Sequence, residues 1–168
     1  MGTSMERGDR PAVQAEGVCR RFGRRVALDD VSLEVRAGEV VAVAGANGSG
    51  KTTFLRILAG LVERDSGSVA VLGVDPRQGP RRLLEHVRFS FAPPTLFDEL
   101  TAREHVRRLP NLAGARVQRA EADAALERLG LGERGDEPVG RFSFGMRQRL
   151  ALALALLPKP QVLVLDEP

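Results

Sequence analysis

Residues 31–35, with the sequence VSLEV, alternate strictly between apolar and polar side chains. This period of two is typical of a half-buried strand, and the turn that follows at residues 36–38 makes it an antiparallel strand leading into the next element. Shorter apolar runs predict further strands at residues 39–44, 68–72, 86–91 and 161–165. The first, third and fourth of these runs are predicted to be buried strands.

Apolar residues recur at helical spacing in the segments between the predicted strands. The pattern predicts helices at residues 53–59, 101–109, 116–131 and 143–157. Ser143 is expected to cap the last helix, and Pro158 and Pro160 to end it. Strands that alternate with helices predict an α/β core, with residues 100–140 as a helical insert between two parts of it.

Residues 45–52 read GANGSGKT, which matches the pattern of a phosphate-binding loop between a strand and a helix. Gly45, Gly48 and Gly50 leave room for backbone N–H groups to surround an anion at a helix N-terminus. Lys51 is expected to reach the β and γ phosphates of a nucleotide, and the Thr52 hydroxyl to bind Mg²⁺. The other residues expected to contact the nucleotide are Ala46, Asn47, Ser49 and Thr53.

The alternative is that residues 45–52 form a glycine- and serine-rich surface turn before an ordinary helix. The strand predicted before the loop and the helix predicted after it favour the phosphate-binding interpretation.

The predicted strand at 161–165 ends at two carboxylates, Asp166 and Glu167. An aspartate at the tip of a strand beside a phosphate loop completes the Mg²⁺ shell, and an adjacent glutamate can polarise the attacking water. We therefore predict Asp166 as a metal ligand, and Glu167 and Lys51 as catalytic residues. The alternative is a strand that ends in two solvated acids, but the phosphate loop in the same chain favours the functional interpretation.

Composition limits the remaining possibilities. At 168 residues the chain is long enough for one domain. Its longest apolar run, residues 150–157, is far shorter than the about 18 to 20 residues that span a bilayer. Residues 1–12 are polar and lack the apolar stretch of a signal peptide, so a disordered tail is expected there. A single cysteine, Cys19, leaves no internal disulfide and agrees with a reducing cytoplasm.

The net charge is +3, and almost all of the basic residues are arginines. A nucleic-acid surface is weakly supported, because the arginines are scattered among acids and the sequence has no Trp or Tyr to stack on bases. A solvated face is the better interpretation, and no nucleic-acid partner is expected.

The phosphate loop, the acidic strand end and their order together resemble the nucleotide-binding subunit of an ABC transporter. The resemblance runs from about residue 13 to the last residue and implies a phosphate-loop NTPase (RecA-like) core with an antiparallel β subdomain. Residues 13–99 and 141–168 would form the core and the β part, and residues 100–140 the helical subdomain. In this family an aromatic residue stacks on adenine, and the matching positions here are Phe22 and its neighbour Val26. Phe22 could equally belong to the core.

The family's signature, close to LSGGQ, opens the helix before the acidic strand. This chain has Ser143 and Gly145 at matching positions, with Phe144 in place of a glycine. The resemblance implies that these residues contact ATP held by a second subunit, in a homodimer or heterodimer. Ala92 stands where the family usually has glutamine, and Leu154 where it commonly has arginine. These departures predict ATP binding with slow hydrolysis.

The family continues beyond its acidic strand with a histidine-bearing strand that lies beside the phosphate-loop strand. The resemblance therefore implies that the present chain is truncated after Glu167 and Pro168, with a gap in the sheet. It also implies an ATPase that energises transport by a separate integral membrane subunit at the cytoplasmic face of the membrane, in the manner of bacterial exporters. The alternatives are a soluble ABC-type ATPase acting on ribosomes or nucleic acid, and a degenerate module that only binds ATP.

Overall fold

The computed structural model describes residues 10–78, 80–91, 93–112 and 114–166. Most of the tail expected at 1–12, the Ala92 substitution and the predicted catalytic Glu167 lie outside these residues. The chain divides into two compact units, residues 1–84 and 85–168. Each unit has its own sheet and its own core, and the two are described in turn.

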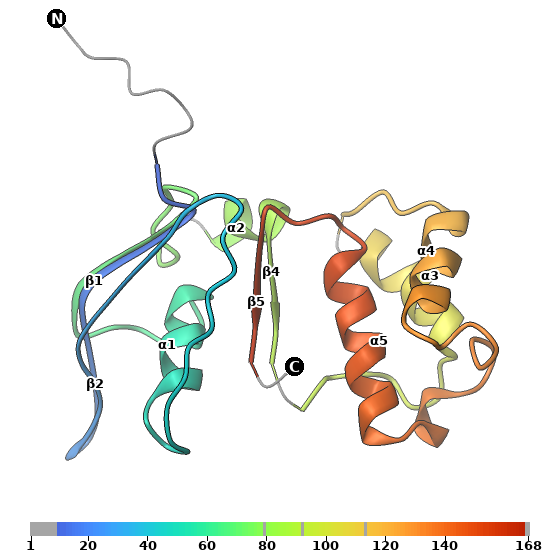
Figure 1. Ribbon diagram of the computed structural model, residues 1–168, viewed down its shortest axis with the longest axis horizontal. Helices are drawn as coiled ribbons and strands as arrows, with labels where there is room; N and C mark the ends of the chain where they lie inside the picture. Colours follow the sequence, from blue (N-terminus) through green and yellow to red (C-terminus); the bar gives the residue numbers. More distant parts are fainter. Residues whose placement is uncertain (1–9, 79, 92, 113, 167–168) are drawn as a thin grey trace, which may run out of the picture. The chain divides into compact units, whose positions relative to one another are not determined.

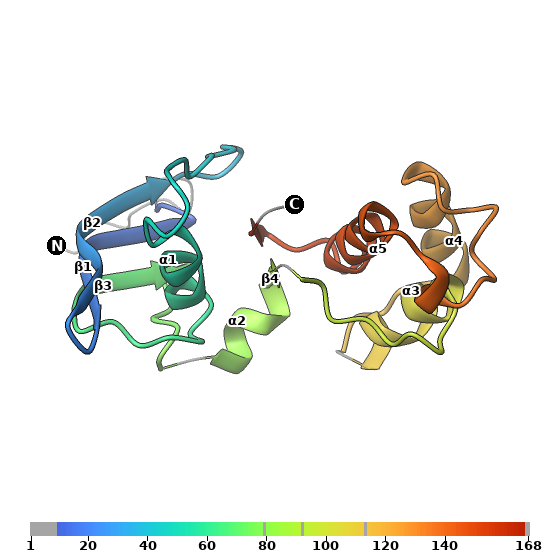
Figure 2. The same ribbon diagram turned by 90° about the horizontal axis from the view of Figure 1, so that it is seen from below.

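The first unit is built on a three-stranded antiparallel sheet in the order β2-β1-β3, with one helix, α1, against it (Figures 1 and 2). The strands are β1 (Val13–Phe22), β2 (Arg25–Val35) and β3 (Ser66–Val71), and the helix is α1 (Lys51–Leu58). The strands predicted at 31–35 and 68–72 are confirmed. Val18 and Val71 from the sheet and Ile57 from the helix form the centre of the core, each at most 2% exposed.

Strand β1 has no clear period of two in the sequence, and the structure shows the reason. Its pairing with β2 shifts register between Ala15 and Val18, where Gly17 has a φ of 58°. A bulge of this kind moves the following side chains to the other face and breaks the alternation on which sequence analysis depends. A Cβ on the facing Gly67 would overlap the carbonyl oxygen of Gly17, so glycine is required at this close approach.

The strand predicted at 39–44 is wrong. These residues are irregular and exposed, and Val40 is fully accessible. A strand exists only where a neighbour receives its backbone hydrogen bonds, and within the described residues no strand pairs with this segment. The segment is therefore apolar enough to form a strand, but no strand among the described residues pairs with it.

The second unit combines a two-stranded parallel sheet with three longer helices. The strands are β4 (Val87–Ser90) and β5 (Val162–Leu165), and they confirm the predictions at 86–91 and 161–165. Only Val87 and Val164 are buried in these strands, because each strand is paired along one edge only within the described residues. Helix α2 (Pro80–His86), which the apolar pattern did not predict, begins in the first unit, ends in the second and immediately precedes β4.

The helices of this unit are α3 (Ala102–Leu112), α4 (Arg119–Arg128) and α5 (Phe144–Leu156), with a 3₁₀ turn, η1 (Val139–Arg141), before α5. They surround a core to which all three contribute, with Val106, Leu126 and Leu150 fully buried at its centre. The α4 helix is shorter than the predicted 116–131. Its capping box, formed by Gln118 and Glu121, fixes where the helix begins.

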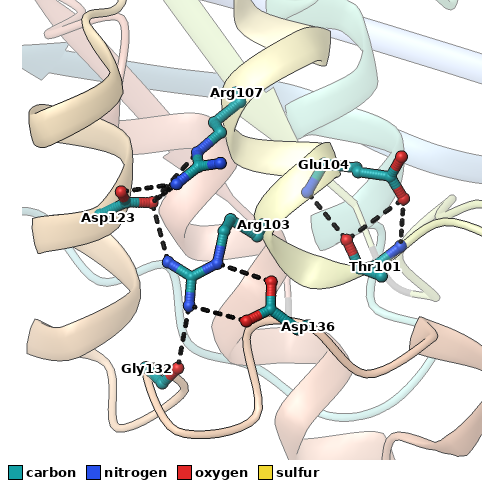
Figure 3. A network of polar contacts seen from close by, with 7 residues as sticks. All are labelled: Thr101, Arg103, Glu104, Arg107, Asp123, Gly132 and Asp136. Atoms are coloured by element: carbon teal, nitrogen blue, oxygen red, sulfur yellow. Dashed lines mark hydrogen bonds and ion pairs between the residues drawn. The ribbon is translucent and has the colours of Figure 1, made fainter.

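A network of arginines and carboxylates joins α3, α4 and the loop at 132–136 (Figure 3). Asp123 accepts hydrogen bonds from Arg107 at 2.7 Å and from Arg103 at 3.0 Å. Arg103 also donates to Asp136 at 2.8 Å. The Arg107 hydrogen bond is the main reason that the pKa of Asp123 lies below its usual range.

This lowered pKa predicts how the second unit responds to acid. A carboxyl group with a depressed pKa in the folded state stabilises the fold fully above its ordinary value of about 3.9, and this contribution is lost as pH falls through the folded-state pKa. We therefore expect Asp123→Asn to flatten the loss of thermal stability between about pH 5 and about pH 2. Thermal unfolding across this range would measure it, with Glu133→Gln as the exposed control. An unchanged profile in Asp123→Asn would contradict the assignment.

Candidate functional site

The phosphate loop lies in the first unit and leads directly into α1. Gly50 is the N-cap of this helix, with a left-handed φ of 99°. A Cβ at this position would overlap the carbonyl oxygen of Ala27 in β2, so only glycine fits. The Phe54 N–H then donates to the Gly50 carbonyl at 2.9 Å, which starts the helical pattern and leaves the first N–H groups of α1 at the loop. This arrangement suits an anion.

Lys51 folds back over the loop. Its ammonium nitrogen donates to the carbonyl oxygens of Gly45 at 2.7 Å and Ala46 at 3.0 Å. The positive charge is therefore held beside residues 45 and 46 of the loop, whose backbone is exposed. Thr52 and Thr53 follow on the first turn of α1 and are partly exposed. Loop residues 45–49, which include the predicted contacts Asn47 and Ser49, are exposed.

The β1–β2 hairpin belongs to the same unit as the phosphate loop. Phe22 is 45% exposed and Val26 is 42% exposed, so neither is a core residue. This exposure favours a role in stacking for Phe22 over the alternative that it packs inside the fold. Arg25, opposite Phe22 in the hairpin register, donates to the Gly48 carbonyl of the phosphate loop at 3.1 Å. The hairpin and the loop are thus linked directly.

The remaining predicted site residues lie in the second unit. Asp166 follows β5 and is 8% exposed, and its backbone N–H donates to Ser90 at 2.9 Å, which extends the β4–β5 ladder. Asp166 and Gly145 line one cavity of about 270 Å³, together with Gln148 and Leu165. The structure thus brings the acidic strand end and the start of α5 together at one cavity.

Ser143 is the N-cap of α5, as predicted, and its hydroxyl accepts a hydrogen bond from the Met146 N–H at 3.3 Å. Apart from its chain neighbours and the backbone of α5, no atom of the described residues lies within 4 Å of the position of a Cβ on Gly145. The side chain of Phe144 is 60% exposed. The helix therefore starts with an exposed glycine next to an exposed phenylalanine.

The residues predicted to bind Mg²⁺ belong to different units, Thr52 to the first and Asp166 to the second. Among the described residues no group of three or more His, Cys, Asp or Glu side chains could hold a metal ion. The predicted site is of a different kind, since it combines one hydroxyl and one carboxylate and leaves the other positions to phosphates and water. The Thr52–Asp166 metal site stays a prediction, as do the nucleotide contacts.

No sequence motif marks Arg20, Arg25 or Asp65 as a site residue. Residues two apart on a strand share a face, but the irregular alternation of β1 hides this relation between Arg20 and Phe22 in the sequence. Nothing local to the sequence indicates that Arg25 reaches Gly48, or that Asp65 reaches Arg20, because these contacts span 23 and 45 residues.

Comparisons with known proteins agree with these features. A family model described as "ABC transporter" matches residues 28–168. The chain is 35% identical over 158 residues to "Uncharacterized ABC transporter ATP-binding protein YdbJ" of Bacillus subtilis, covering 94% of this chain and 51% of that protein. It is 40% identical over 160 residues to "Daunorubicin resistance ATP-binding protein DrrA2" of Streptomyces coeruleorubidus, covering 94% of this chain and 49% of that protein. The chain thus spans about half the length of these two curated relatives.

A solved structure, described as "Structure of ATP binding subunit of ABC transporter", superposes with a TM-score of 0.82 at 28% identity. The match covers 94% of this chain and 66% of that one. This similarity confirms the predicted fold class, a phosphate-loop NTPase core with an antiparallel β part. No helix within the described residues is both long and apolar enough to cross a membrane.

Proposed function

The chain belongs to the ABC transporter family, and we propose that it is an ATP-binding subunit that binds and hydrolyses MgATP to drive transport by a separate membrane-spanning protein. The observation that carries this proposal is the phosphate loop. The helix that follows the loop starts at Gly50, where only glycine fits. The ammonium group of Lys51 lies over the backbone of the loop. These are the two features that polyphosphate binding requires.

The residues of this chain have distinct roles in the proposed reaction. Lys51 would exchange its contacts with the Gly45 and Ala46 carbonyls for the β and γ phosphates, and so neutralise charge that develops during transfer. Thr52 and Asp166 would hold Mg²⁺, which when bound draws electron density from the phosphate oxygens. Glu167 would orient and polarise the attacking water. Phe22, with Val26 beside it, would stack on the adenine.

A second ATP-binding subunit is the proposed partner of the α5 N-terminus. Ser143 and Gly145 are exposed there, and free N–H groups at a helix start attract an anion. Phe144 stands between them and is itself exposed. Slow hydrolysis is the expected result, because a bulky ring beside Gly145 hinders close approach of the partner's γ phosphate. Comparing ATP affinity with the turnover rate separates this slow enzyme from a module that only binds ATP.

The membrane partner is proposed to contact the second unit between β4 and α3. A hollow of about 410 Å³ lies there, lined largely by apolar side chains that include Phe89, Phe91, Leu96 and Leu154. An apolar hollow with a few polar residues at its edge suits a short segment of another protein. The protein would then act at the cytoplasmic face of the membrane.

Co-purification tests the proposal. The protein, tagged and expressed in its natural host, is expected to bring down an integral membrane protein from detergent-solubilised membranes, and Leu96→Asp in the hollow is expected to abolish the association while ATP binding persists. Exposed Glu133→Ala serves as the matched control. Retention of RNA or DNA in place of a membrane protein would instead support the soluble ATPase.

A further inference from the structure

Arg20 covers part of the ring on which we propose that the adenine stacks. Its guanidinium carbon lies 4.7 Å from the centroid of the Phe22 ring. At this distance a guanidinium group over an aromatic face is held by a cation–π interaction. Phe22 as a whole remains 45% exposed, so the residue keeps open surface for a ligand. Because the arginine lies over one face of the ring, a base would have to stack on the opposite face.

The guanidinium group of Arg20 is itself anchored. Its Nη1 donates to one carboxylate oxygen of Asp65 at 2.9 Å, and the other oxygen accepts the Arg21 backbone N–H at 2.7 Å. The backbone N–H of Asp65 in turn donates to the Cys19 carbonyl at 2.9 Å. Asp65 is therefore fixed against β1 at both its side chain and its backbone. Only 24% of the Arg20 side chain is exposed, in keeping with a fixed position.

The same hairpin is tied to the phosphate loop. Phe22 pairs with Arg25 across the hairpin, and Arg25 donates to the carbonyl of Gly48 at 3.1 Å. The end of the hairpin that carries Phe22 is therefore linked to the loop that would hold the phosphates. A ligand with a base at one end and phosphates at the other can use both features at once.

We infer that Arg20, held by Asp65, is a positioning residue that fixes the Phe22 ring for base stacking. The inference rests on the proposed function, because it concerns the base of the same nucleotide. An exposed ring that is ordered before the ligand arrives loses less side-chain freedom on binding. Arg20 should therefore strengthen binding only of ligands that carry a base.

The test compares ATP with inorganic tripolyphosphate, which has the phosphates but no base, by calorimetry on the intact protein. Arg20→Met keeps most of the length of the side chain but removes the cation and its Asp65 contact. It is expected to weaken ATP binding by roughly three- to tenfold and to leave tripolyphosphate binding unchanged. Arg20→Lys should recover part of the loss. Arg24→Met, a loss of the same charge in the same hairpin, should behave as the wild type.

A double variant shows whether Arg20 acts through the ring. In a Phe22→Leu background, Arg20→Met should have no further effect on ATP affinity. Unchanged ATP affinity in Arg20→Met, equal weakening of both ligands, or full additivity with Phe22→Leu would each overturn the inference while leaving the proposed function intact. Failure of the wild type to bind either ligand would instead refute the proposed function, and this inference with it.

Discussion

Lys51→Ala is expected to reduce the affinity for ATP by at least about a hundredfold, because it removes two or more charge-assisted hydrogen bonds to phosphate, each worth about 1.5 to 3 kcal/mol. The structure places the ammonium nitrogen at 2.7 and 3.0 Å from two loop carbonyls. Phosphate oxygens bound at this loop would replace the two carbonyl oxygens as hydrogen-bond acceptors of the ammonium group. The loss is thus local to the site and does not depend on a rearrangement elsewhere.

The chain provides a matched control for this substitution, since its other lysine, Lys159, lies in the second unit. The Lys159 side chain is 79% exposed and pairs with Glu121 at 2.6 Å on the surface. Lys159→Ala should leave ATP affinity within about twofold of the wild type, because an exposed ion pair contributes little. Titration calorimetry with MgATP measures both variants. A Lys51→Ala protein that binds ATP as the wild type does would remove the phosphate loop from the site.

The elements that sequence analysis predicted well are those whose pattern is local. The GKT end of the phosphate loop and the Ser143 cap are set by residues within one turn of the chain, and the structure places the start of a helix at each. Strand β1 was not predicted, because the bulge at Gly17 interrupts its alternation. Residues 39–44 show the opposite error: they have the composition of a strand, but whether a strand forms depends on a partner elsewhere.

The candidate site shows the same division. The loop residues could be identified from a short motif, because the motif encodes its own backbone geometry. The contacts of the β1–β2 hairpin with Asp65 and with the phosphate loop could not be identified from the sequence. Arg20 and Asp65 are 45 residues apart, and only the antiparallel pairing of β1 with β3 brings the segments that carry them together. The solvent exposure of Phe22 could not be predicted either, because a single aromatic residue at the end of a strand occurs both in cores and at surfaces.

Asp75→Ala is expected to destabilise the first unit by roughly 3 to 5 kcal/mol, because it leaves a buried arginine without its carboxylate. Arg64 is 7% exposed and meets Asp75 through two parallel hydrogen bonds, at 3.2 and 2.7 Å. Its Nε also donates to the Gly67 carbonyl at 3.0 Å, beside the close approach of β1 and β3. The Arg64 hydrogen bonds hold the pKa of Asp75 well below its usual range, which reflects a strong preference for the charged form.

The double variant Arg64→Met/Asp75→Leu separates the strength of the ion pair from the cost of an unpaired charge. Removing both charges also removes the burial of an uncompensated guanidinium group, so this variant should recover at least half of the loss seen in Asp75→Ala. Glu34→Ala is the control, since Glu34 and Arg36 form an ion pair whose side chains are 47% and 71% exposed. It should cost less than about 1 kcal/mol. Urea unfolding measures the free energy of unfolding of all three variants. If Asp75→Ala lost no more of this free energy than Glu34→Ala, the buried ion pair would not be what holds the segment after α1 against β3.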